Sequence, residues 1–198
     1  MTPLPTPPVL VITDRTQAAR PLPDIAETLF AGGIRWLSLR DRDLPYLARL
    51  ALARELVARA KPYGAVVTVH GDIELAHAAG AAGVHLGARG NPAAARARLG
   101  PRALIGVSTH DLASAQAATG ADYVTLSPIF LTSSKPGYGP ALGLDRLAAI
   151  AAAVAVPVIA LGGIDPVTAQ DCRRAGAAGV ALMGLAMATP EALRGLSA

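Results

Sequence analysis

Two histidines stand where this chain could carry out acid–base chemistry. His70 ends one short apolar run, and His85 lies inside the next one along the chain. Imidazole titrates near neutral pH, so a histidine at the end of a strand is a candidate proton donor or acceptor. We predict that His70 is catalytic and that His85 is buried and hydrogen-bonded. His77 and His110 are expected on helix surfaces.

Another apolar run, earlier in the chain, ends at Arg40, and Arg42 stands two residues further on. A guanidinium can hold a phosphate or carboxylate through two parallel hydrogen bonds. We therefore predict that this pair binds an anion. The alternative is that both arginines only form surface ion pairs with Asp41 and Asp43.

A polar segment at 131–140 is rich in Gly and Pro and longer than a short connection requires. It carries Lys135, one of only two lysines, with the hydroxyls of Thr132 and Ser134 nearby. A compact ammonium group beside hydroxyls suits a phosphate. We predict a lid over the site with Lys135 as a functional residue. A solvated surface lysine is the alternative.

Glycines follow the last two apolar runs, as Gly162-Gly163 and as Met183-Gly184. Glycine lets backbone N–H groups approach a ligand closely, and a helix N-terminus adds positive potential. These two strand ends are therefore predicted to form a phosphate cradle. The alternative is that the glycines only turn the chain.

Eight short apolar runs alternate with helical stretches and would position these side chains. Several runs follow a glycine that ends a helix, because glycine adopts the left-handed cap without a steric penalty. Near-continuous apolar runs are typical of parallel strands buried on both faces. We predict an α/β fold, a single (β/α)8 TIM barrel over residues 1–198, rather than an open doubly wound sheet. The predicted strands are 9–13, 36–40, 65–69, 84–87, 103–107, 123–126, 156–161 and 180–184.

The composition excludes several classes of protein. Hydrophobic residues make up 52% and charged residues 16%, which is incompatible with a disordered chain. The net charge of +4 comes without a basic run, and aromatics are only 4%, so nucleic-acid binding is not expected. A small anionic ligand fits the charge better.

Three further features indicate a cytoplasmic protein. Cys172 is the only cysteine, so no internal disulfide can form. The Pro-rich tail at 1–8 lacks the pattern of a signal peptide. The longest apolar run, 147–164, is interrupted by Pro157 and is interpreted as a helix followed by a strand rather than a membrane span.

Seven motifs, in a fixed order, cover nearly the whole chain. They are Val11-Ile12-Thr13-Asp14, Leu39–Arg42, Gly83–Gly87, Gly106-Val107-Ser108, Ala121-Asp122-Tyr123, Ser127–Lys135 and Pro157–Ile164. Together they resemble the thiamine phosphate synthase/TenI superfamily. The resemblance implies a phosphorylated thiazole as ligand, with its phosphate on the backbone of Gly163, Met183 and Gly184. It also implies that the 131–140 segment lies over the site.

The chain departs from this superfamily at its metal ligands. The synthases join a thiazole phosphate to a pyrimidine diphosphate with Mg²⁺ held by two aspartates. The first aspartate follows an asparagine after the third strand, where this chain reads His70-Gly71. The second stands three residues after the glycine that ends the fourth strand, where this chain has Gly90. The loss of two hard oxygen ligands removes the predicted Mg²⁺ site.

A glycine at the first aspartate position is similar to the TenI branch, whose members act as thiazole tautomerases. That branch has a catalytic histidine just after the sixth strand, where this chain has Pro128. We predict a metal-independent tautomerase of thiamine biosynthesis, with His70 and Lys135 as catalytic residues and Arg40 or Arg42 holding the substrate carboxylate. The alternatives are a thiamine phosphate synthase with an altered Mg²⁺ site, or a non-catalytic phosphate-ligand binder. No cofactor is expected unless the synthase alternative holds. Met183, Leu185 and the alanine-rich helices would permit a homodimer.

Overall fold

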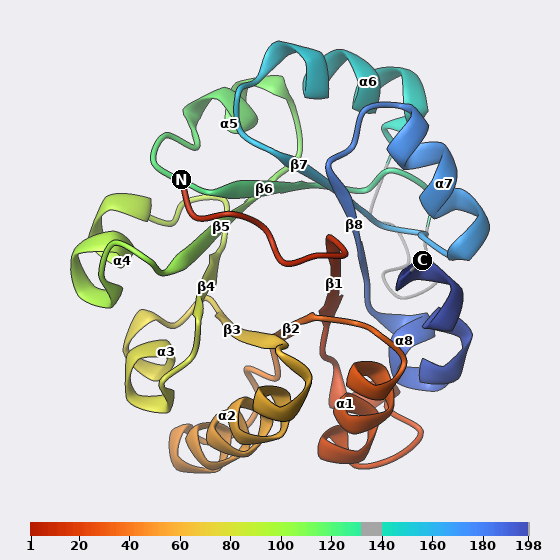
Figure 1. The fold of residues 1–198 in the computed structure, drawn as a ribbon. Helices are drawn as coiled ribbons and strands as arrows, with labels where there is room; N and C mark the ends of the chain where they lie inside the picture. Colours follow the sequence, from red (N-terminus) through yellow and green to blue (C-terminus); the bar gives the residue numbers. More distant parts are fainter. Residues whose placement is uncertain (132–139, 198) are drawn as a thin grey trace.

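The computed structural model describes residues 1–131 and 140–197, and in it eight parallel strands close into a barrel. Each strand pairs with its neighbours in the sequence, and β8 pairs with β1. Figure 1 looks along the barrel and shows helices around the outside of the strands. The predicted (β/α)8 fold is therefore confirmed. The strands are β1 Val9–Ile12, β2 Trp36–Leu39, β3 Val66–His70, β4 Gly83–Leu86, β5 Leu104–Thr109, β6 Tyr123–Leu126, β7 Val158–Leu161 and β8 Gly179–Leu182.

Helices begin at residues that the sequence marks as caps. Asn91 accepts a hydrogen bond from the N–H of Ala94, and Asp165 accepts from the first turn of its helix. Asp111, not Thr109, caps the helix after β5. The α-helices are α1 Leu22–Ala31, α2 Tyr46–Ala60, α3 Ile73–Ala79, α4 Pro92–Leu99, α5 Leu112–Ala117, α6 Gly143–Ala153, α7 Pro166–Arg174 and α8 Gly184–Ala188. Short 3₁₀ turns are η1 Arg15–Gln17, η2 Lys61–Tyr63 and η3 Pro190–Ser197.

The strands bury both of their faces, as the continuous apolar runs predicted. One face packs against the helices in a large core that includes Leu37, Val69 and Val124. The other face lines the inside of the barrel with a separate cluster that includes Trp36 and Tyr123. The rings of these two aromatics meet edge to face with centroids 4.6 Å apart. The strands are thus held rigidly on both sides.

Gly106 makes room for Tyr123, one of the two large aromatic side chains of this interior cluster. A Cβ at this position of β5 would collide with the phenol ring of Tyr123 on β6. The two residues face one another across the strand pair, because Gly106 and Tyr123 are in register. This glycine is therefore needed for close packing inside the barrel rather than for a turn.

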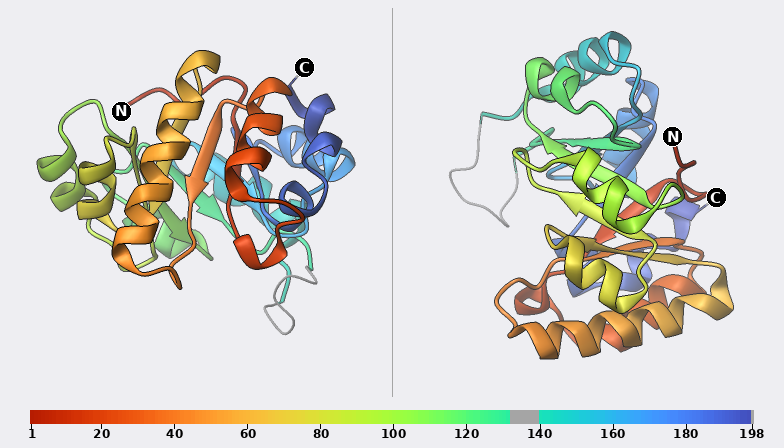
Figure 2. Two further views of the ribbon diagram at one scale, coloured as in Figure 1. Left: turned by 90° about the horizontal axis from the view of Figure 1, so that it is seen from below. Right: turned by 90° about the vertical axis from the view of Figure 1, so that its left-hand side faces the viewer.

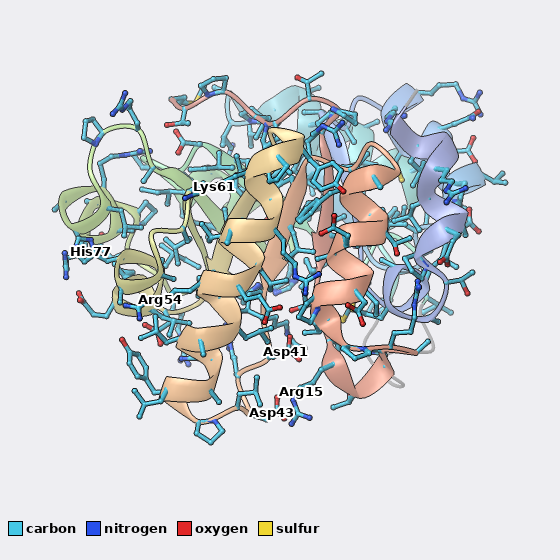
Figure 3. All side chains as sticks on the ribbon, turned by 60° about the horizontal axis from the view of Figure 1, so that its bottom comes forward. Arg15, Asp41, Asp43, Arg54, Lys61 and His77 are labelled. Atoms are coloured by element: carbon cyan, nitrogen blue, oxygen red, sulfur yellow. The ribbon has the colours of Figure 1, made fainter. Side chains whose placement is uncertain are left out.

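The two ends of the barrel differ in what covers them. Figure 2 shows the barrel from the side, with the N-terminal segment crossing one end. In Figure 3, Lys61 lies towards that end, whereas Arg15, Asp41 and Asp43 lie together at the other. The strands run from the covered end to the end marked by these three residues. Their carboxyl ends, where a barrel of this class places its site, form the mouth.

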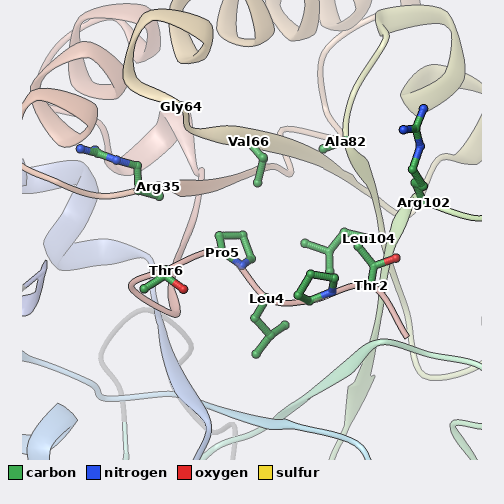
Figure 4. Close-up of a pocket in the computed structure, with 11 residues that line it drawn as sticks. Thr2, Leu4, Pro5, Thr6, Arg35, Gly64, Val66, Ala82, Arg102 and Leu104 are labelled. Carbon is green, nitrogen blue, oxygen red and sulfur yellow. The ribbon is translucent and has the colours of Figure 1, made fainter.

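The N-terminal segment closes the amino end of the barrel. The N–H of Thr2 donates to Asp122 Oδ1 at 2.6 Å, and Leu4 packs against the interior cluster. A pocket of about 360 Å³ remains between this segment and the strands (Figure 4). Arg35 and Arg102 stand at its edge, and the guanidinium of Arg35 donates to the carbonyl of Phe30 at the end of α1. In the part of the chain that the structure describes, no helix has the length and apolar character needed to cross a membrane.

Candidate active site

Arg40 is oriented at the mouth by a network between the ends of β1 and β2. Thr13 Oγ1 donates to the buried carboxylate of Asp41 at 2.5 Å and accepts from the N–H of Arg40 at 2.9 Å. The Arg40 guanidinium lies 3.8 Å from Asp14 and stays partly exposed. Asp41 is thus a buried structural carboxylate and not the surface partner considered above. The exposed pair that does form joins Asp43 to Arg15.

Arg42 lies against the end of β3. Its Nη2 atom would stand 2.5 Å from a Cβ on Gly71, which has a positive φ of 78°. Among the residues that the structure describes, Arg42 forms no ion pair, and its side chain is exposed. The backbone of Gly71 is therefore a platform under a guanidinium that is available to a ligand. Arg40 and Arg42 both belong to the mouth, as predicted.

His70 ends β3 beside a buried polar chain inside the barrel. Its ring centroid lies 4.7 Å from that of His85 on β4. His85 Nδ1 is 2.9 Å from Tyr123 Oη, and His85 Nε2 is 2.9 Å from Ser108 Oγ. Thr125 adds a longer contact of 3.4 Å to Nε2. The prediction of a buried, hydrogen-bonded His85 is confirmed, and His70 is the imidazole of the pair that is nearer the mouth.

Burial keeps the imidazole of His85 neutral. Desolvation, together with the smaller effect of the nearby charge of Arg42, lowers the pKa of His85 from 6.5 to about 3. Burial likewise raises the pKa of Tyr123 well above 10. The neutral imidazole of His85 and the neutral phenol of Tyr123 are therefore joined by a hydrogen bond between two uncharged groups. This buried pair supports the ring of His70 without placing a second charge beneath the mouth.

His110 was expected on a helix surface, and this prediction is wrong. Strand β5 continues to Thr109, two residues beyond the apolar run, so His110 stands at the mouth directly before the cap of α5. Its Nδ1 lies 2.8 Å from the carbonyl oxygen of Ser127, the residue that follows β6. A second imidazole is thus brought beside the Ser127-Pro128 peptide. His77, by contrast, is exposed on α3 as expected.

The glycines after β7 are required by the local packing. Gly162 and Gly163 have φ values of 102° and 65°, and a Cβ on Gly163 would lie 2.6 Å from the carbonyl oxygen of Leu131. The N–H of Phe130 donates to the carbonyl of Gly162, which joins the β6 and β7 ends. These glycines let the backbone approach closely, and their phosphate contact stays a prediction.

The two helices beyond these strands offer less positive potential than predicted. Asp165 already accepts hydrogen bonds from the N–H groups of Val167 and Thr168, so the start of α7 is capped. Helix α8 has only five residues, with Met183 as its N-cap and Gly184 as its first residue. The Met183 sulfur lies 3.9 Å from Gln17 Nε2 at the edge of the mouth. Thr132, Ser134 and Lys135 lie outside the described residues.

The mouth carries four aspartates whose oxygens are already engaged by protein groups. In the part of the chain that the structure describes, no three His, Cys, Asp or Glu side chains are grouped closely enough to hold a metal ion. Magnesium prefers carboxylate oxygens that keep open lone pairs and bound waters. The residues present therefore do not fit the Mg²⁺ site that the resemblance implies. Asp14 is bound by Thr16 and Gln17, Asp41 by Thr13 and Arg15, Asp43 by Arg15, and Asp72 by Leu75 and Arg49.

Comparisons with known proteins agree along the whole barrel. Residues 9–185 match a family model described as thiamine monophosphate synthase. A putative thiamine-phosphate synthase of Geobacter sulfurreducens is 45% identical, over 91% of this chain and 87% of that protein. A thiamine-phosphate synthase of Methanoculleus marisnigri is 43% identical, over 87% of this chain and 84% of that protein. The solved thiamine phosphate pyrophosphorylase from Pyrococcus furiosus superposes with a TM-score of 0.82 at 28% identity, covering 94% and 89% of the two chains.

Proposed function

Since the chain belongs to the thiamine monophosphate synthase/TenI family, we propose that it forms thiamine phosphate from a thiazole phosphate and a pyrimidine diphosphate. From the sequence, we predicted a tautomerase, with this synthase reaction as the alternative. The relatives named above carry the names of thiamine-phosphate synthases, and they support the second interpretation better. Both activities belong to thiamine biosynthesis.

The observation that carries the proposal is that two separate sets of candidate anion-binding groups stand at one mouth. Arg40 and Arg42 follow β2, and the glycine-rich backbone follows β7 and β8. Strand β1 lies between these two places, because β2 and β8 both pair with it. A reaction with two phosphorylated substrates needs two such subsites. In this proposal the diphosphate lies at β2 and the thiazole phosphate at β7 and β8.

The coupling step requires placement and charge stabilisation more than proton transfer. The lone pair of the thiazole nitrogen forms the new C–N bond to the methylene carbon of the pyrimidine. The electrons of the broken C–O bond leave with the diphosphate oxygen, and the thiazole becomes a thiazolium. Negative charge therefore develops on the diphosphate, where guanidinium groups stabilise it. His70, at the end of the neighbouring strand β3, donates an N–H to the same diphosphate.

The direct test is to incubate the purified protein with both substrates and to measure thiamine phosphate by chromatography. Formation of thiamine phosphate, lost in the Arg40→Ala variant and retained in Arg102→Ala at the opposite end, supports the proposal. Isomerisation of a carboxythiazole phosphate without coupling would contradict it in favour of the tautomerase. Tight binding of thiazole phosphate with neither reaction would leave only a ligand-binding protein.

A tautomerase remains the second candidate because of one geometric feature. The TenI branch is similar to this chain but has its catalytic histidine just after the sixth strand. Here the imidazole of His110 reaches the carbonyl of Ser127 at that same place from the end of β5. The matched test is His110→Asn against His77→Asn, with isomerisation of the thiazole as the readout. A tautomerase would lose turnover only in the first variant.

A further inference from the structure

We propose that this chain releases the diphosphate without a divalent cation, because Arg42 above Gly71 takes the place of a metal ion. This inference rests on the proposed coupling reaction and goes beyond it. It concerns the metal site, where the chain's own residues depart from the pattern of its family.

At both positions where the family carries a metal aspartate, a side chain would meet a neighbouring group: the Cβ of Leu86 at Gly90, and the guanidinium of Arg42, which would have to shift, at Gly71. A Cβ on Gly90 would lie 2.5 Å from the Cβ of Leu86, an atom that cannot move without its backbone. At Gly71 a Cβ would lie 2.5 Å from Arg42 Nη2 and 3.1 Å from Arg42 Cζ. The positive φ of Gly71 adds strain for any other residue. At both positions, therefore, neighbouring groups of this chain occupy space next to the glycine, in addition to the carboxylate being absent.

The nearby carboxylates cannot substitute for the missing pair. Asp72, the next residue after Gly71, caps α3 through the N–H of Leu75 and pairs with Arg49 at 2.5 Å. Asp41 is 4% exposed, and each of its two oxygens accepts a hydrogen bond. Withdrawing either carboxylate to bind a cation would leave buried donors without acceptors, which is unfavourable. The carboxylates on the β2–β3 side of the mouth are therefore engaged in structural hydrogen bonds and ion pairs.

Positive charge stands where the cation would have been. Arg42 forms no ion pair among the described residues, and its charge is felt as far inside as His85, where it lowers the pKa of the imidazole. Arg89, one residue before Gly90, is also exposed and unpaired within the described part of the chain. A guanidinium remains charged at every physiological pH and binds two phosphate oxygens at once. It can therefore stabilise a departing diphosphate as a bound metal does in other enzymes.

The first experiment measures binding of inorganic diphosphate by calorimetry, once in excess EDTA and once in millimolar Mg²⁺. We expect wild-type protein to bind in EDTA, and Arg42→Ala to weaken this binding about ten- to hundred-fold. Arg42→Lys keeps the charge without the fork and should fall between the two. Arg102→Ala, an exposed arginine at the amino end, is the matched control and should bind as wild type does.

Binding that appears only with Mg²⁺, or that is the same in Arg42→Ala, would overturn the inference. Thermal melting of each variant in the absence of diphosphate shows whether it is folded. If Arg42→Ala does not fold, Arg42→Lys and the EDTA comparison on wild-type protein still decide the question.

The second experiment measures coupling with both substrates in EDTA and in Mg²⁺. We expect turnover in EDTA to stay within about threefold of turnover with Mg²⁺, because charge stabilisation comes from the protein. A fall to background in EDTA would overturn the inference while leaving the proposed synthase activity intact. Absence of coupling under both conditions, together with metal-free binding of diphosphate, would instead remove the proposed function and leave the Arg42 subsite.

Discussion

Two arginine–aspartate pairs, one at each end of the barrel, use the same chemistry for different purposes. At the amino end, the carboxylate of Asp122 is fully buried and accepts from Arg96 at 2.7 Å, from the N–H of Ile105 at 2.8 Å and from the N–H of Thr2. At the mouth, Asp43 is about half exposed, and among the described residues its ion-pair partner is Arg15. The buried pair holds a strand, a helix and the N-terminal segment together. The exposed pair has no comparable structural role.

The arginines at the two ends also differ in how strongly they are paired. Arg96 has committed its guanidinium to structure, whereas Arg42 has none of its nitrogen atoms in an ion pair within the described residues. Arg40 is intermediate, with Asp14 at 3.8 Å. We infer that stability and ligand binding are divided between these two arginines, Arg96 at the amino end and Arg42 at the mouth. The predictions below test that separation.

The largest effect is expected at Asp122. Its replacement by alanine leaves the buried N–H of Ile105 without an acceptor and Arg96 without its counter-ion, so the free energy of unfolding should fall by about 3–5 kcal/mol. Urea denaturation measures this change. The matched control, Asp171→Ala, removes an exposed partner of Arg174 and should leave stability almost unchanged. A small loss at Asp122 would show that the amino end does not depend on this carboxylate.

The next effect is expected at Arg40, and on activity rather than stability. Arg40→Ala should lower kcat/KM for thiamine phosphate formation about a hundredfold, because it removes a charged hydrogen-bond donor from the diphosphate. Its melting temperature should stay within about two degrees of wild type, since the guanidinium is partly exposed and only loosely paired. A large fall in melting temperature with no change in kcat/KM would reverse the roles assigned to the two ends.

A smaller effect concerns the dependence of stability on pH beneath the mouth. His85 has a pKa of about 3 in the folded protein against 6.5 for an ordinary histidine, so below pH 6.5 the unfolded chain binds a proton that the folded chain refuses. Stability should therefore fall as the pH falls from about 6.5 towards 3, by up to about 1.4 kcal/mol per pH unit from this residue. Above pH 6.5 the residue contributes no pH dependence.

Denaturation of wild type and His85→Asn between pH 7 and pH 4 isolates this contribution, because carboxylates affect both proteins alike. The slope should be shallower in His85→Asn. His77→Asn on the surface of α3 is the control and should retain the wild-type slope. Equal slopes in wild type and His85→Asn would mean that the imidazole is protonated in the folded protein.

The smallest effect is expected for Asp43→Ala at the mouth. An exposed ion pair contributes at most about 1 kcal/mol, because water and salt screen it. Denaturation in low and in high salt should give nearly equal stabilities for this variant and wild type. A loss comparable to that of Asp122→Ala would erase the difference between the two ends on which the comparison rests.

The strands could be predicted from the sequence because local features mark each of them. A glycine with positive φ stands near several helix ends, as at Gly80, and an apolar run follows. The strand ends were less certain, since polar residues can continue an extended strand. Ser108 and Thr109 do so in β5. His110 therefore lies at the mouth and not on a helix surface as predicted.

Contacts between strand ends could not be predicted in the same way. Arg42 and Gly71 lie on different connections, and their approach depends on the register in which β2 pairs with β3. The sequence shows that a carboxylate is missing at Gly71, but not that a guanidinium fills the space. Likewise, the four aspartates near the mouth look like metal ligands until their hydrogen-bond partners are known.

The close fit between Gly106 and Tyr123 constrains how this barrel can change over evolution. Any side chain at position 106 collides with the phenol ring, and a smaller residue at position 123 leaves a void beside Trp36 and removes the hydroxyl that contacts His85. Each single replacement is therefore unfavourable, although a double replacement can restore the packing. We expect the two positions to vary together among related barrels. Directed evolution of the mouth should leave both untouched.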